Sequence, residues 1–211
     1  MDSTNQPLDD LREIRNLMER STRFLSLSGL SGISAGFIAL VGASVAFFLL
    51  DYDQRYFEPQ SYFSFQGMRY TGFIPALILD GAIVLIAALI TSFYFTYRRT
   101  RKKGLPIWDK TTRRMLIALS FPLVAGGVFC LFLLCHHLVY LIAPAILIFY
   151  GLGLISASHF TLPELRYLGI SEVILGLIAG VFIGYGLIFW AAGFGILHII
   201  YGFRMYYKYE R

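Results

Sequence analysis

The sequence predicts an all-α membrane protein with six transmembrane helices, and three observations lead to that fold class. Hydrophobic residues make up 57% of the 211-residue chain and charged residues only 15%, too few to cover the surface of a soluble domain. Six apolar segments each approach the roughly 20 residues that a helix needs to cross a bilayer. The positive charge between these segments lies almost entirely on one side, which predicts the orientation.

The six predicted spans cover about 26–50, 73–97, 115–135, 138–158, 167–184 and 186–205. The last two are separated only by the turn Gly184-Tyr185-Gly186. Of the 18 Lys and Arg, all but Arg55 and Arg69 fall on the side of the two termini. Since cytoplasmic loops are enriched in Lys and Arg, we expect both termini in the cytoplasm and the protein in the cytoplasmic (inner) membrane of a bacterium.

The segment before the first span, 1–25, is predicted to be a cytoplasmic amphipathic helix. Leu8, Leu11, Ile14 and Met18 form one apolar stripe along 6–22. Such a helix either lies on the membrane surface or docks a cytoplasmic protein partner, and amphipathicity fits both. The length of this polar segment argues against a cleavable signal peptide.

Two loops and a tail complete the membrane domain, 26–206. The outer loop 51–72 carries seven Tyr and Phe residues, which predict a hairpin held at the interface or, alternatively, a ligand cap. The inner loop 98–114 is basic, and Arg98, Arg99, Arg101, Lys102 and Lys103 are expected to contact lipid headgroups or a partner protein. This charge reports topology, so no nucleic-acid partner is expected. Residues 207–211 form a cytoplasmic tail.

Small residues suggest an internal repeat of two-span hairpins. The first, third and fifth spans each begin near an Arg and lead into an Ala-Gly step. Gly32 and Gly36 in the first, and Gly176 and Gly180 in the fifth with Gly184 beyond them, are spaced for close helix packing, within the chain or in a homo-oligomer. Three parallel hairpins are the predicted arrangement, and chance similarity between apolar helices is the competing explanation.

The last hairpin carries a family resemblance. The run from Glu172 to Gly180, the short turn at Gly184, and Gly193-Phe-Gly-Ile-Leu-His-Ile-Ile-Tyr-Gly-Phe-Arg resemble one repeat of the HdeD-like membrane proteins over 166–206. The resemblance implies three such hairpins and no established catalytic residues, in a family associated with bacterial acid resistance. The long aromatic outer loop and the long basic inner loop depart from that pattern.

Glu172 and His198 are the most specific pair of ionisable residues in the predicted spans. Each lies thirteen residues from Tyr185, so both fall at the same depth, ~20 Å from the turn, on adjacent antiparallel helices. A buried ionisable side chain costs roughly 2.5–3.5 kcal/mol on insertion scales, so each residue needs a reason to be there. The two interpretations are an intramembrane polar pair that joins two helices and a proton-responsive or substrate-binding pair.

Asp80, in the outer half of the second span, is a second candidate. It either hydrogen-bonds a Ser or Tyr or forms an ion or solute site. Cys135-His136-His137, even with Cys130, lacks the spacing of a metal site, and no disulfide, metal or cofactor is expected. His159 is expected to be a solvated loop residue.

Gly29-Leu-Ser31-Gly32 resembles the serine signature of rhomboid-type intramembrane proteases. Here it stands in the first span instead of the fourth, so no catalytic residue is assigned. The sequence thus predicts a non-enzymatic membrane protein, a sensor of envelope or pH stress or a regulatory scaffold that acts through its cytoplasmic helix and basic loop. The alternatives are a small oligomeric permease or channel for an ion or small solute and, third, an intramembrane hydrolase.

Overall fold

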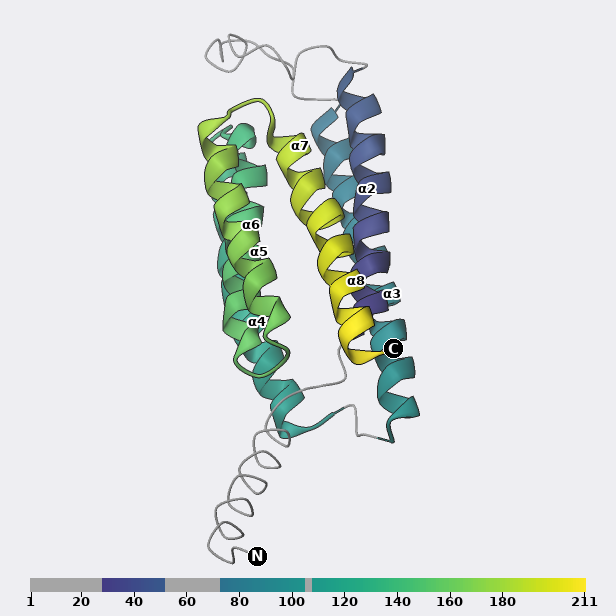
Figure 1. Cartoon of the computed structure of the whole chain (residues 1–211). Helices are drawn as coiled ribbons and strands as arrows, with labels where there is room; N and C mark the ends of the chain where they lie inside the picture. Colours follow the sequence, from purple (N-terminus) through teal and green to yellow (C-terminus); the bar gives the residue numbers. More distant parts are fainter. Residues whose placement is uncertain (1–27, 52–72, 105–107) are drawn as a thin grey trace, which may run out of the picture.

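The protein is an antiparallel helical bundle in the computed structural model, which describes residues 28–51, 73–104 and 108–211 (Figure 1). Every described segment long enough to cross a membrane is helical, because only a helix or a closed barrel satisfies the backbone hydrogen bonds in lipid. The predicted amphipathic helix over 1–25 and the aromatic residues of 52–72 lie outside the described residues.

The chain runs up and down the bundle in sequence order. Its elements are α2 (Gly29–Asp51), α3 (Phe73–Lys102), α4 (Lys110–Cys135), the short 3-10 turn η2 (Val139–Leu141), α5 (Ile142–Ser158), α6 (Glu164–Val181), α7 (Gly186–Trp190), the π-helical turn η3 (Ala191–Leu197) and α8 (His198–Tyr209). The last three follow without interruption, so residues 186–209 form one rod.

Five helices in the described part of the chain are long and apolar enough to cross a membrane. These are 29–49, 75–102, 110–135, 139–158 and 186–209. The predicted fifth span corresponds to α6, which has 18 residues and includes the charged Glu164, Arg166 and Glu172. The structure therefore supports a polytopic membrane protein that contacts the lipid bilayer through several helices.

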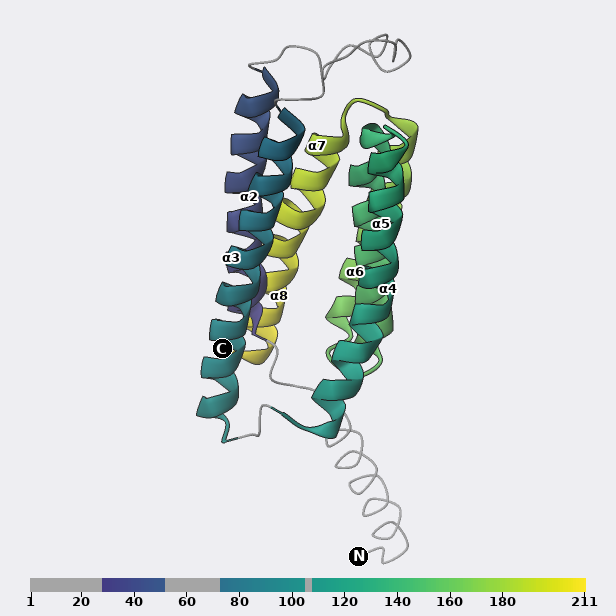
Figure 2. The same ribbon diagram turned by 180° about the vertical axis from the view of Figure 1, so that it is seen from behind.

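The helices form two groups of three, with the rod 186–209 on the inner side of the first group (Figures 1 and 2). One group contains α2, α3 and α7–α8, and the other contains α4, α5 and α6. The first two predicted hairpins, α2–α3 and α4–α5, pack closely. The third is divided: α6 packs mainly on α5, whereas α8 packs mainly on α2.

Polar and conformationally special residues set the helix ends. The Asp109 carboxylate accepts a hydrogen bond from the Thr112 N–H at 2.6 Å and so caps α4. Gly184, with φ +98°, makes the turn between α6 and α7, a backbone conformation that glycine adopts without strain. The predicted basic loop is much shorter than 98–114, because α3 continues to Lys102 and α4 begins at Lys110.

An apolar core joins the two groups near the end of the bundle where α8 ends. Leu154 of α5, Leu162, Leu165 and Leu168 of the α6 region, and Met205 of α8 are buried against one another. Burying such side chains brings α8 into contact with the second group of helices as well as with α2. The polar contacts described next lie along this same boundary.

Candidate functional site

Glu172 and His198 lie side by side in the middle of the bundle. Glu172 is on α6, and His198 is the first residue of α8. The His198 Nδ1 atom is 3.4 Å from Glu172 Oε1. The exposed fractions are 0% for Glu172 and 6% for His198, so neither ionisable group reaches the surface of the bundle. The structure thus brings together the two residues that sequence spacing placed at equal depth.

The hydrogen bonds of His198 identify its tautomer. Nδ1 is 3.0 Å from the Gly193 carbonyl oxygen, which can only accept, so Nδ1 carries the proton. Nε2 of the neutral ring then accepts a hydrogen bond from the Tyr150 hydroxyl at 2.7 Å. The Tyr150 contact comes from α5, so His198 links the rod 186–209 to the second group of helices.

The π-helical turn η3 makes room for the Glu172 carboxylate. It lies directly before His198, and its Gly193 carbonyl contacts the imidazole. A Cβ at Gly193 would lie 2.5 Å from Glu172 Oε2, so only glycine allows the carboxylate to lie against this backbone. Within the described residues, neither carboxylate oxygen has a hydrogen-bond partner.

Aromatic rings pack against His198. The Phe194 ring is stacked on the His198 ring, with centroids 5.7 Å apart, and it also contacts Tyr150 at 4.8 Å. Trp190 follows at 5.3 Å from Phe194. The pair is therefore enclosed by apolar surface, in which a net charge is far less stable than in water.

A second polar contact joins the ends of α6 and α8. Lys208 Nζ is 2.7 Å from Glu164 Oε1, and the Tyr209 hydroxyl donates to both carboxylate oxygens at 3.1 and 2.9 Å. Glu164 is buried and precedes the predicted span 167–184. Burial works against its ionisation, but the hydrogen bonds, from Lys208 above all, outweigh burial and hold the Glu164 pKa below its ordinary value of 4.5.

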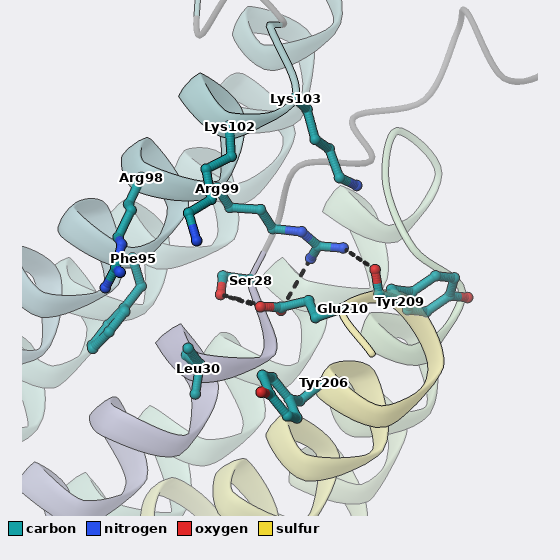
Figure 3. A pocket seen from close by; sticks show the side chains of 10 residues that line it. All are labelled: Ser28, Leu30, Phe95, Arg98, Arg99, Lys102, Lys103, Tyr206, Tyr209 and Glu210. Carbon is teal, nitrogen blue, oxygen red and sulfur yellow. Dashed lines mark hydrogen bonds and ion pairs between the residues drawn. The ribbon is translucent and has the colours of Figure 1, made fainter.

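The third polar cluster lies where α3 and α8 end and α2 begins (Figure 3). Glu210 accepts hydrogen bonds from the Ser28 hydroxyl, the Gly29 backbone N–H and Arg99, whose Nη1 is 3.2 Å away. Arg99 Nη2 also donates to the Tyr209 carbonyl at 2.9 Å. Glu210 therefore caps the start of α2 and neutralises a buried arginine.

The five basic residues predicted to face headgroups or a partner differ in their placement. Arg99 is buried, whereas Arg98, Arg101, Lys102 and Lys103 are exposed. Arg98, Lys102 and Lys103 line a cavity of about 320 Å³ together with Arg99 and Glu210. Arg101 lines a different, shallower hollow beside Tyr94 and Tyr97, which Arg98 and Lys102 also border.

Asp80 is not part of the Glu172–His198 site. It lies on α3 facing α2, where a Cβ built on Gly42 would be 3.7 Å from Asp80 Oδ2. No hydrogen bond or ion pair joins Asp80 to any other described residue. A permease would need a path that both Asp80 and the buried pair line. The position of Asp80 between α3 and α2 gives no support for such a path.

The predicted packing glycines separate into two classes. A Cβ at Gly36 would lie 2.7 Å from the Gly195 carbonyl oxygen, one at Gly32 would lie 3.2 Å from Gly202 Cα, and one at Gly176 would meet Ile148 at 2.8 Å. A Cβ at Gly180 or Gly184 would meet nothing within 4 Å among the described residues of the chain. Gly180 is half-buried, and Gly184 belongs to the turn between α6 and α7.

The remaining sequence candidates lie apart from His198. The Ser31 hydroxyl donates to the Ser28 carbonyl, so the serine of the rhomboid-like motif is engaged with its own helix start. Cys130 is half-buried and Cys135 exposed, both as free thiols. No group of three His, Cys, Asp or Glu residues that could hold a metal ion is found in the parts of the chain that the structure describes.

Several functional groups were not predicted from the sequence. Tyr150 and the Gly193 carbonyl complete the His198 site, and Glu164 and Glu210 anchor the end of α8. The only sequence signal for the last two was their acidic character among basic neighbours. Comparisons of the chain with protein-family models, curated proteins and solved structures give no match.

Proposed function

We propose that this protein is a non-enzymatic, proton-responsive regulator in the bacterial cytoplasmic membrane, with Glu172 and His198 as its responsive element. The observation that carries the proposal is a completely buried carboxylate whose nearest ionisable partner is a histidine 3.4 Å away. Histidine changes charge near neutral pH more readily than any other side chain, and burial makes each charge state costly.

The proton count of the pair decides whether the bundle encloses a net charge. An ionised Glu172 beside a neutral His198 has one negative charge. One added proton, on either the carboxylate or the imidazole, makes the pair neutral overall. A second proton leaves a single positive charge, and removal of the proton leaves a single negative charge. Either charge favours a rearrangement that admits water or another partner, because the surrounding rings offer no compensation.

Protonation also changes the hydrogen bond between α5 and α8. In the neutral ring, Nε2 accepts from the Tyr150 hydroxyl. A protonated ring has donors on both nitrogens, so Nε2 would donate to the Tyr150 oxygen, and the phenol hydrogen would need another acceptor. The contact that joins the two groups of helices is therefore sensitive to the same proton.

A change at His198 has a direct route to the end of the bundle. His198 begins α8, and the last residues of that helix contact Glu164 of α6 and Arg99 of α3. A shift of α8 would disturb contacts with α2, α3 and α6 at once. The basic segment 98–103 lies at this end, so it is the surface through which we expect a cytoplasmic protein partner to read the change.

We further propose six spans with both termini cytoplasmic, in an arrangement related to the HdeD-like hairpins. In support, α6 runs beside α5 through the same thickness of the bundle (Figure 1), and Arg99 meets Glu210 at the end where the Lys and Arg gather. The divided packing of α6 and α8 limits the resemblance to connectivity. The permease alternative has weaker support, because Asp80 lies on another helix pair.

The test uses two reporters in the full-length protein in nanodiscs. The first reporter is the fluorescence of Trp190, which packs on Phe194, the ring stacked on His198. The second is a fluorophore attached to the exposed inner-loop position Trp108→Cys, a substitution that also removes the other tryptophan. Cys130→Ser and Cys135→Ser remove the native thiols. We expect both signals to change together as the pH is varied. Glu172→Gln or His198→Gln should remove that common transition.

The matched control is Glu164→Gln, which removes a buried carboxylate outside the pair and should leave the Trp190 transition in place. A Trp190 transition without a response of the loop reporter would show a purely structural pair. If the loop reporter stays constant across the pH range, the regulatory proposal is wrong. Liposome flux that depends on Asp80 and Glu172 together would instead favour a permease.

A further inference from the structure

The last turns of α3 form a hollow lined by aromatic and cationic side chains. It has a volume of about 450 Å³ and is lined by Tyr94, Tyr97, Arg98, Arg101 and Lys102. Each tyrosine precedes an arginine by four residues, so each ring lies one helical turn from a guanidinium. No acidic residue of the described chain lines this hollow. It is therefore a positively charged surface with an aromatic border.

The hollow lies where the apolar surface of α3 meets its basic end. α3 packs on α2, and apolar side chains on its uncovered side precede the hollow, with Leu89, Ile90 and Phe93 61%, 63% and 65% exposed. In a helix long enough to cross a membrane, such a surface contacts lipid tails. Tyrosine is enriched at the headgroup level of a bilayer, because its ring is apolar and its hydroxyl is polar. Tyr94 and Tyr97 therefore mark the interface on this side of α3.

The three cations that line the hollow repel one another. Arg101 is three residues after Arg98 and Lys102 is four, a spacing that places like charges next to each other on a helix. All three are exposed, and within the described residues none of them forms an ion pair. Figure 3 shows Arg98 extending away from Glu210, toward which Arg99 extends. An anion bound between the three side chains would relieve the repulsion.

The end of the helix accounts for only part of this arrangement. Arg101 and Lys102 lie in the last turn of α3, where the partial negative charge of the free carbonyl groups favours cations. That effect does not explain two tyrosines one turn earlier. A guanidinium binds two phosphate oxygens at once, and an aromatic ring one turn away can contact the hydrocarbon part of the same molecule. The Phe93 ring, 6.1 Å from the Tyr97 ring, extends this aromatic surface along the exposed side of α3.

We propose that this hollow binds the headgroup of an anionic phospholipid in the leaflet next to the basic end of the bundle. Arg98 and Arg101 bind the phosphate oxygens, Lys102 adds positive charge, and the rings of Tyr94 and Tyr97 contact the glycerol and the first carbons of the tails. The charge of the hollow selects an anionic headgroup over a zwitterionic one. The site is separate from the buried glutamate–histidine pair, so it does not depend on the proposed response to protons.

Tryptophan fluorescence beside the hollow tests this binding in nanodiscs. The full-length protein first carries Trp108→Phe and Trp190→Phe, which remove both tryptophans of the chain. Phe93→Trp then places a single reporter next to the hollow without changing a residue that lines it. Phosphatidylglycerol and phosphatidylcholine are mixed in the bilayer, and one or the other carries bromine atoms on its tails, which quench the fluorescence on contact. The two quenching curves give the relative affinity of the two lipids for this position.

Ile117→Trp in the same background is the matched control reporter. Ile117 is 60% exposed and lies one turn after the exposed Arg113 and Arg114 of α4, a basic helix end without neighbouring tyrosines. If the hollow is a site for an anionic headgroup, the preference for phosphatidylglycerol over phosphatidylcholine should be stronger at the Phe93→Trp reporter than at the Ile117→Trp reporter.

Substitutions in the hollow should weaken this preference in proportion to the charge removed. Because a Lys or Arg near an anionic surface contributes about fivefold in affinity, Arg98→Gln or Arg101→Gln should each reduce the preference at the Phe93→Trp reporter by about that factor. Arg101→Lys keeps the charge and should retain most of the preference. Arg114→Gln, at the basic end of α4, should change the signal of this reporter little.

Two results would overturn the proposal. One is an equal preference for phosphatidylglycerol at the two reporters, which is the result expected from general surface charge. The other is a preference at the Phe93→Trp reporter that survives Arg98→Gln together with Arg101→Gln, which would leave these residues only a role at the end of α3. The melting temperature of each variant in nanodiscs shows that the fold is intact before the quenching is compared.

Discussion

At the scale of single residues, the ionisable groups inside this bundle are arranged as contacts between helices. His198 contacts Glu172 on α6, Tyr150 on α5 and the Gly193 carbonyl of its own rod. A charged or polar side chain in a membrane helix is retained when a neighbouring helix satisfies it or when function requires it. Side chains or backbone from α5, α6 and the rod 186–209 therefore meet at one imidazole.

The Glu164 carboxylate gives the first prediction at this scale. Its pKa is held below the ordinary value in the folded protein, so its ionised contacts stabilise the fold above about pH 4.5, and that stabilisation is lost as the pH falls through the lowered pKa. We expect the amides in the first turns of α6 to exchange hydrogen faster below that range. Hydrogen exchange measured across an acid series checks the effect.

Glu164→Gln is the control for this prediction. It removes the titrating group, so the first turns of α6 should exchange faster at neutral pH and show no further acid-dependent step. An unchanged acid step in Glu164→Gln would mean that another group is responsible.

At the scale of elements, glycines rather than apolar stripes decide which helices meet. α2 and the rod 186–209 approach through Gly32 and Gly36 on one side and Gly195 and Gly202 on the other. Backbones that come this close gain van der Waals contact along their length, which is the main drive to association in lipid. The π-helical turn η3 comes directly before His198, whose Nδ1 lies 3.0 Å from the carbonyl of Gly193 in that turn.

Gly36→Ala and Gly180→Ala form a matched pair that tests this packing. The new Cβ at Gly36 would meet the Gly195 carbonyl at 2.7 Å, so we expect a loss of about 1–3 kcal/mol in the free energy of unfolding. At Gly180 there is nothing within 4 Å among the described residues, and the helix preference of alanine should leave stability equal or up to about 1 kcal/mol higher. Unfolding in mixed detergent micelles measures both, and equal losses would contradict the packing.

At the scale of the whole molecule, the last helix closes the bundle. The rod 186–209 packs on α2, the first described helix, and contacts α5 and α6 of the other group. Glu210 near the C-terminus contacts Ser28 and Gly29 at the start of α2. The two groups of helices are therefore held together by the final element of the chain, and both described chain ends lie at the same end of the bundle (Figure 1).

Side-specific labelling tests the six-span topology. In a Cys130→Ser background, a membrane-impermeant maleimide should label Cys135 from outside, and with Cys135→Ser it should label Tyr185→Cys from outside and His159→Cys from inside. The last two sites lie at opposite ends of α6, where Tyr185 and His159 are exposed. Labelling of both from one side would show that α6 does not cross the membrane.

Several features of the fold and site follow from particular residues in the sequence. The apolar segments predict the helices, and the end of α6 and the start of α7 fall where Gly184-Tyr185-Gly186 indicates a turn. Equal spacing from Tyr185 predicts that Glu172 and His198 share a depth, and the structure places them 3.4 Å apart. The boundary at 98–114 was less predictable, because basic residues continue α3 and begin α4 as helix.

The sequence by itself determined the all-α class, the length and order of the apolar helices, and the depth of the ionisable residues, because the thickness of a bilayer and the rise of a helix set these. Only the tertiary structure decided that α8 packs on α2, that Tyr150 and Gly193 complete the His198 site, and that Glu210 neutralises Arg99. In a soluble protein an apolar stripe marks the buried face of a helix. In lipid both faces are apolar, so the sequence pattern does not mark which face meets a neighbour, and close packing and polar contacts make that choice.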